Sequence, residues 1–110
     1  MGFYKEKEGP ELVAGPVLGD SSGLYLEIPT HLRNRLEVVV GSRFVGSLMT
    51  VTKKNGKSLG LNAGGIFDVK GYWNEMHLPD EMVRRHSIEK EKFVEIKLHQ
   101  IIGSGRWAPV

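Results

Sequence analysis

The chain contains no cysteine, which excludes disulfide scaffolds, thiolate zinc sites and cysteine nucleophiles. It also lacks long apolar runs, because the stretch at residues 38–40 is among the longest, whereas a transmembrane helix needs about 20 apolar residues. The first residues include acidic side chains where a signal peptide needs an apolar stretch. We therefore expect a cytoplasmic protein that does not enter a membrane.

A strong excess of one charge is missing as well. Fifteen lysines and arginines stand against 13 aspartates and glutamates, and the resulting net charge of +2 permits nucleic-acid binding without requiring it. Hydrophobic residues make up 40% and charged residues 25%, a balance that excludes wholesale disorder. At 110 residues, the chain is expected to form a single domain over residues 1–110.

Glycine, in contrast, is plentiful. Its 14 copies are spread along the chain, which indicates many short elements joined by tight turns. Two segments also resemble each other: LVAGPVL at residues 12–18 matches LNAGGIF at 61–67, and LEIP at 26–29 matches MHLP at 76–79. We interpret this as an internal repeat covering about residues 11–52 and 60–102.

Each copy is expected to contain two strands, a short helix and a closing strand. The helices should begin just after the two matching prolines, with Thr30 and Asp80 as N-caps. Leu32 and Met82 occupy matching places and should anchor the two helices to the core.

The closing strands are expected at residues 44–51 and 93–102, where the second run alternates cleanly between apolar and polar side chains. An Asn-Gly pair at residues 55–56 predicts the hairpin that joins the two copies. The ends of the chain, residues 1–10 and 103–110, are expected to be flexible tails.

The segment LYLEIPTHLRNRLEVVVGSRF, residues 24–44, resembles the AbrB/SpoVT swapped-hairpin family of DNA-binding proteins. The residues that carry the resemblance are Ile28-Pro29, Leu32-Arg33, Leu36, Val38, Gly41 and Phe44 in the first copy, and Leu78-Pro79, Met82, Arg84-Arg85, Ile88 and Val94 in the second. Family members usually contribute one such unit per chain. Two units in one chain imply a mostly β fold: a six-stranded barrel of the double-psi type, built from two ββαβ repeats with two short helices.

The resemblance also implies a DNA-facing surface. The candidate nucleic-acid-binding residues are Arg33, Arg35, Arg84 and Arg85 on the two helices, with Lys53, Lys54 and Lys57 in the hairpin. The same residues allow plainer interpretations. The arginines can form a solvated helix face with salt bridges to Glu37 or Glu81, and the lysines can form a solubilising turn that keeps a sheet edge from pairing.

Two functions follow from these residues. The first is a small DNA-binding protein, a transcription regulator or antitoxin-like protein; the alternative is a barrel module that binds a protein or small ligand without nucleic acid. A homodimer is compatible with both. The four histidines lack metal-ligand spacing and no catalytic set is visible, so we expect no metal, no cofactor and no enzymatic activity.

Overall fold

The structure, a computed structural model, describes residues 11–52, 56–103 and 106–110, without the side chains of residues 106 and 107. The protein is mostly β, with two short helices. The elements are β1 (Glu11–Pro16), β2 (Leu18–Asp20), β3 (Gly23–Glu27), α1 (Thr30–Leu36), β4 (Arg43–Thr52), β5 (Ser58–Val69), β6 (Glu75–His77), α2 (Asp80–Arg85), β7 (Phe93–Gly103) and β8 (Arg106–Pro109).

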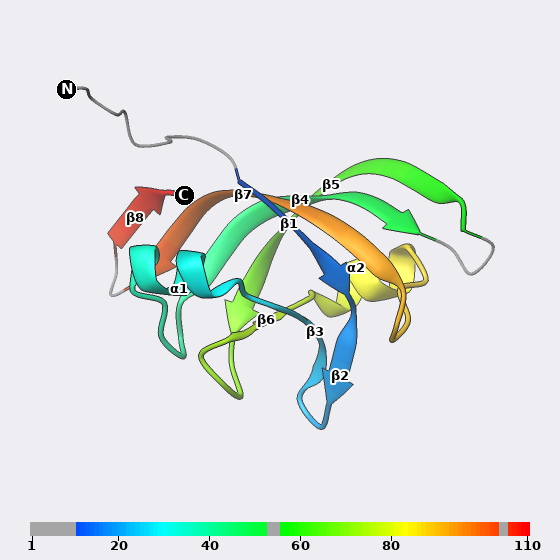
Figure 1. Ribbon diagram of the computed structural model, residues 1–110. Coiled ribbons are helices and arrows are strands. Elements are labelled where there is room, and N and C mark those ends of the chain that lie inside the picture. The colour runs from blue at the N-terminus through cyan, green and yellow to red at the C-terminus, as the bar shows by residue number, and fades with distance from the viewer. Residues whose placement is uncertain (1–10, 53–55, 104–105) are drawn as a thin grey trace.

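All of these strands belong to one antiparallel sheet that curls around the core (Figure 1). Its order is β1-β7-β4-β5-β6-β3-β2, and β8 is added on β7. The first and last strands of this order are separated in sequence only by Val17, whose N–H donates to Lys92 O at 2.8 Å. The two end strands of the sheet, β1 and β2, therefore follow each other directly along the chain, and the sheet curls into a barrel-like shape.

The two halves of the chain use the same elements in the same order and pair them in the same pattern. β4 pairs with β7 and β3 with β6, while β1 lies against β7 as β5 lies against β4. Burial also recurs, because residues 31–40 and 81–90 have the same sequence of buried, partly buried and exposed positions. Residues 50 apart are therefore equivalent in the helix regions, as Leu32 and Met82 are.

The first strand of each half follows a different register from the one that the sequence match suggests. Gly15 pairs with Val94, and Phe67 occupies the equivalent place beside Phe44. Equivalent residues thus lie three positions further along β5 than the match between residues 12–18 and 61–67 predicts. The physical reason is the period of two in a strand: that match equates buried Val17 with Ile66, which is 43% exposed.

Both helices begin directly after a proline in extended conformation, with ψ of 142° at Pro29 and 140° at Pro79. These prolines are the N-caps, so the expected caps at Thr30 and Asp80 are wrong. Each proline carbonyl accepts the first regular i→i+4 bond of its helix, from Arg33 N at 3.1 Å and from Val83 N at 3.0 Å, and no side chain among the described residues caps either N-terminus.

Each helix is anchored to the core by one buried side chain, as expected. Leu32 is 0% and Met82 6% exposed. They join a continuous core whose largest fully buried members include Phe44, Phe67 and Leu26. Neither helix of the described residues is long and apolar enough to cross a bilayer.

The C-terminal segment differs from the flexible tail expected over residues 103–110. Gly103 still belongs to β7, β8 pairs antiparallel with the same strand, and Val110 is 1% exposed. Backbone hydrogen bonds to β7 order this segment, and no periodic pattern within it would have revealed them. Eight strand segments are present where six were expected, because of β8 and the break at Val17. The other predicted tail, residues 1–10, lies outside the described residues.

Candidate functional site

The predicted arginine surface is divided between two places. Figure 1 shows α1 and α2 at opposite ends of the curled sheet. On α1, the Arg33 guanidinium lies 4.0 Å from the centroid of the Trp73 ring and donates to Thr30 Oγ1 at 2.9 Å. On the same helix, Arg35 Nη2 lies 3.3 Å from Glu11 Oε1. Both α1 arginines are therefore engaged with the protein itself.

The arginines of α2 do not mirror those of α1. Arg85 occupies the place of Arg35, but the equivalent of Arg33 is Val83, which leaves one symmetric arginine pair instead of two. Arg85 Nη2 lies 2.9 Å from Glu81 Oε1, one turn earlier on the helix, and both side chains are exposed. This is the salt-bridged helix face that the sequence offered as the plainer interpretation. Arg84 is exposed.

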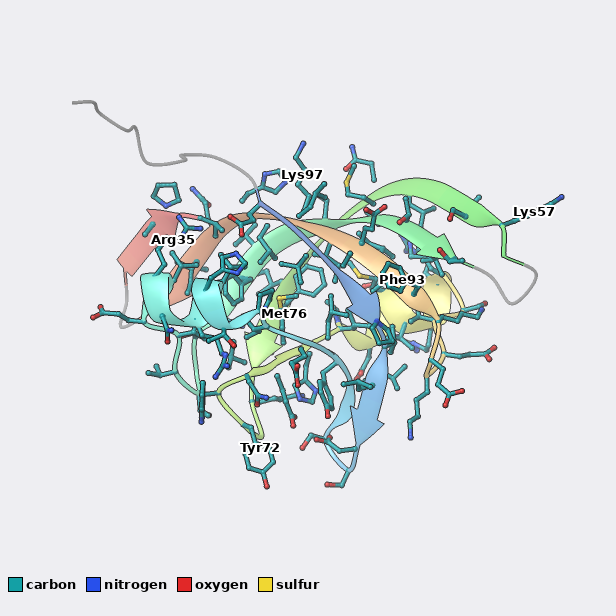
Figure 2. The ribbon with its side chains drawn as sticks, viewed as in Figure 1. Arg35, Lys57, Tyr72, Met76, Phe93 and Lys97 are labelled. Atoms are coloured by element: carbon teal, nitrogen blue, oxygen red, sulfur yellow. The ribbon has the colours of Figure 1, made fainter. Side chains whose placement is uncertain are left out.

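Lys57 lies apart from the α1 arginines (Figure 2). Figure 2 places Lys57 at the far end of the β4–β5 hairpin, away from Arg35. Lys53 and Lys54 lie outside the described residues. The structure thus does not gather the described candidates onto one face.

A different feature stands out along β5. Within the described chain, residues 58–60 and 63–67 of this strand pair on one side only, with β4, because β6 reaches only Asp68 and Val69. The register against β4 shifts between Gly60 and Ala63. The segment reads SLGLNAGGIF and has neither a charge nor a proline. Its other edge therefore presents unpaired backbone N–H and C=O groups, at every second residue, to an added strand.

A groove of about 380 Å³ runs beside this edge. Four consecutive β5 residues, 63–66, line one wall, and Met82 and Arg85 of α2 line the other together with the C-cap residue His86. The wall is close because Gly65 has no side chain: a Cβ there would lie 2.9 Å from Met82 Cε.

The equivalent place in the first half of the molecule is filled by the chain itself. Glu11 on β1 is equivalent to Ala63 on β5 in the strand registers. Its carboxylate lies 2.7 Å from His31 Nε2 and 3.3 Å from Arg35 Nη2, and its side chain is only 14% exposed. On β5 the equivalent residue, Ala63, has no carboxylate, and Arg85 pairs instead with Glu81, which also lines the groove.

No protein-family model, curated protein or solved structure matches the chain.

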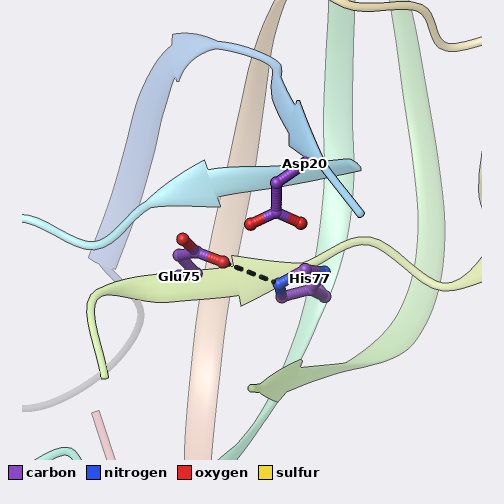
Figure 3. Close-up of side chains that lie close together, drawn as sticks. All are labelled: Asp20, Glu75 and His77. Carbon is purple, nitrogen blue, oxygen red and sulfur yellow. Dashed lines mark hydrogen bonds and ion pairs between the residues drawn. The ribbon is translucent and has the colours of Figure 1, made fainter. Parts of the chain in front are cut away.

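A second polar site lies at the lower end of the sheet in Figure 1, where Asp20 on β2 meets Glu75 and His77 on β6 (Figure 3). Glu75 Oε1 and His77 Nε2 are 3.1 Å apart, and both side chains are buried. Burial raises the pKa of the Glu75 carboxyl, as does a hydrogen bond with Asp20, while the hydrogen bond with His77 opposes the rise.

Sequence reasoning missed both sites. The signal for the β5 edge was present in the ten uncharged residues 58–67, although which side stays unpaired depends on tertiary pairing. For the cluster, the i, i+2 spacing of Glu75 and His77 places both on one face of a strand, but nothing local brings Asp20 to them.

Proposed function

We propose that the protein is a binding module that takes an extended, acidic and apolar segment of a partner protein as an additional strand on β5. This is the protein-binding alternative that the sequence left open. The observation that carries it is the unpaired, uncharged edge of residues 58–67 beside the α2 groove. Strand addition of this kind obtains affinity from main-chain hydrogen bonds and specificity from pockets for alternate side chains.

The contrast with β1 supports a functional edge. Exposed sheet edges are normally protected by charges, proline or short length, because they otherwise pair with other chains. β1 has six residues, begins at Glu11 and ends at Pro16, whereas β5 has 12 residues and carries neither charge nor proline over residues 58–67, where only a register shift between Gly60 and Ala63 interrupts the edge. β1 and β5 occupy equivalent positions in the two halves, so the fold tolerates a charge and a proline at such an edge.

The acidic character of the partner follows from Glu11. In the first half, this carboxylate pairs with His31 and Arg35 of α1, and Arg35 has its equivalent in Arg85. A carboxylate on an added strand can make the same bond to Arg85 by displacing Glu81, since that exposed pair is weakly held. Met82 in the groove offers an apolar contact to the neighbouring side chain of the strand.

Fluorescence polarisation tests the proposal with a labelled ten-residue peptide of alternating valine and threonine with one central glutamate. A charge-assisted hydrogen bond contributes about 1.5–3 kcal/mol, so we expect Arg85→Ala to weaken binding by about tenfold or more. The matched control Arg35→Ala, on the filled side, should bind as the wild type does. A peptide with glutamine in place of glutamate should be weaker for the wild type and unchanged for Arg85→Ala.

A second variant tests the edge itself. A Cβ at Gly64 would have only Gly46 O nearby, at 3.9 Å, so Gly64→Lys fits the fold while placing a charge on the edge. It should abolish peptide binding. The proposal is overturned if no peptide binds the wild type, if Gly64→Lys binds normally, or if size-exclusion shows that a second copy already occupies β5.

DNA is a second candidate, favoured by the exposed basic pair in the last turn of α2. Here the protein acts as a small regulator or antitoxin-like protein, and Arg84 and Arg85 contact phosphates. Binding to a random duplex should then weaken with salt at a log–log slope of about −0.9 per phosphate contacted. Arg84→Ala distinguishes the candidates, because it should flatten that slope by about one and leave peptide binding unchanged. A duplex that does not bind at low salt removes this candidate.

We also propose a finer description of the fold. The curled sheet is a six-stranded barrel of the double-psi type, in which β1 and β2 count as one strand and β8 is an addition. The return of the pairing path across Val17 supports it, and so does the Ile28-Pro29 motif of the AbrB/SpoVT resemblance. A crystal structure would test both, and cell fractionation would test the predicted cytoplasmic location.

A further inference from the structure

The side chains of Asp20, Glu75 and His77 meet where β2, β3 and β6 lie side by side. β3 pairs with both of the other strands. One potential ligand atom from each of the three residues lies within 4.8 Å of the other two (Figure 3). Asp20 comes from the first half of the chain and the other two residues from the second.

Two features of this cluster would lower the stability of the fold if its side chains only filled space in the core. Glu75 and His77 are 4% and 3% exposed, and burying such groups is unfavourable unless all their polar atoms find partners. His77 Nδ1 is buried and has no hydrogen-bond partner among the described residues. The repeat does not require these residues, because the equivalent positions in β3 are Tyr25 and Glu27.

We propose that Asp20, Glu75 and His77 bind a divalent transition-metal ion of the Zn²⁺ type. One imidazole nitrogen and two carboxylates form a common ligand set for such ions. In tetrahedral geometry, metal–ligand bonds of about 2.0–2.2 Å place two ligand atoms about 3.3–3.6 Å apart, so a pair 4.8 Å apart would need to close by about 1.2–1.5 Å. Asp20 is exposed, so the ion would reach the cluster from solvent on the Asp20 side.

The surroundings of the cluster fit this assignment. Gly71 has a φ of +80°, and a Cβ there would lie 2.9 Å from Glu75 Oε1, so the turn before β6 leaves room for this carboxylate. The ring of Tyr25 packs against His77 with centroids 5.3 Å apart and restrains the imidazole. The bound ion would join the two halves of the chain at the side of the molecule away from β1 and β7.

The test uses the full-length protein after chelator treatment and follows Zn²⁺ binding by calorimetry and thermal melting. We expect one saturable site in the wild type and a rise in Tm on adding Zn²⁺. Asp20→Asn should weaken binding at least tenfold. This variant should fold, because an asparagine oxygen can still accept the hydrogen bond that Asp20 Oδ1 takes from Ser22 N at 2.7 Å.

Asp68→Asn is the matched control, since Asp68 is a half-exposed carboxylate on β5 paired with Arg43. It should bind Zn²⁺ as the wild type does. The visible spectrum of the Co²⁺-loaded protein should change in Asp20→Asn and not in Asp68→Asn. Absence of saturable binding overturns the proposal and identifies the cluster as a hydrogen-bond network. Equal binding by both variants also overturns it, because the ion then binds elsewhere.

Discussion

Replacing Gly46 with alanine should destabilise the protein strongly. Gly46 lies on β4 at the point where its register against β7 shifts, between Val45 and Gly46. A Cβ there would lie 2.5 Å from the backbone carbonyl oxygen of Lys97 and 3.2 Å from Leu98 Cδ2. Because the nearest atom belongs to the backbone of a central strand, relief requires β4 and β7 to separate.

The expected magnitude is a balance of two effects. Forcing extra atoms into a packed interior typically costs about 1–3 kcal/mol. Alanine also lowers the conformational entropy of the unfolded chain, which stabilises the folded state by about 0.4–1 kcal/mol. The separation of two paired strands places Gly46→Ala at the upper end, so we expect a net loss of about 2 kcal/mol in the free energy of unfolding.

Urea denaturation followed by circular dichroism measures this loss, and Gly64→Ala is the control. Gly64 lies on the adjacent strand opposite Ser47, where a Cβ meets only one atom, at 3.9 Å. The free energy of unfolding of Gly64→Ala should equal that of the wild type or exceed it by up to about 1 kcal/mol. If Gly46→Ala is as stable as Gly64→Ala, the two central strands do not approach each other as described.

Two further predictions concern the core and the buried cluster. Leu32→Ala and Met82→Ala should each lower the free energy of unfolding, measured by urea denaturation, by about 2–5 kcal/mol. The loss should be larger for Leu32, because Met82 borders the open groove. Losses below about 0.5 kcal/mol for both variants would contradict the assigned helix faces. In chelator, the raised pKa of Glu75 means that the folded state holds this proton more tightly than the unfolded state. The contribution of Glu75 to stability should therefore be fully present below its ordinary pKa of 4.5 and be lost as pH rises through the folded-state value. The difference in Tm between the wild type and Glu75→Gln should change over this pH range.

Local patterns in the sequence were sufficient for much of the fold. The alternation over residues 93–102 predicted β7, and the prolines at 29 and 79 marked the starts of both helices. The register of β1 against β5 was not predictable in the same way. The sequence similarity between residues 12–18 and 61–67 reflects two glycine-containing strands. Which residues of the two strands are structurally equivalent depends instead on which side chains face the core.

The candidate sites were harder to predict, for reasons of distance along the chain. The Glu81–Arg85 pair follows from helical spacing and was foreseen. The position of Glu11 against α1 is a contact across 24 residues to Arg35, and no local pattern encodes it. The same holds for Asp20, which only the pairing of β2 with β3 and of β3 with β6 brings to Glu75.

The interleaved pairing of the two halves has a consequence for how the protein is made. β1 bonds to β7, β3 to β6 and β4 to both β5 and β7, so each half contributes strands that the other half must complete. A growing chain on the ribosome cannot close its core until β7 has emerged. Until then, the unpaired strands of the first half stay exposed, and this nascent chain is the species most in need of chaperone protection.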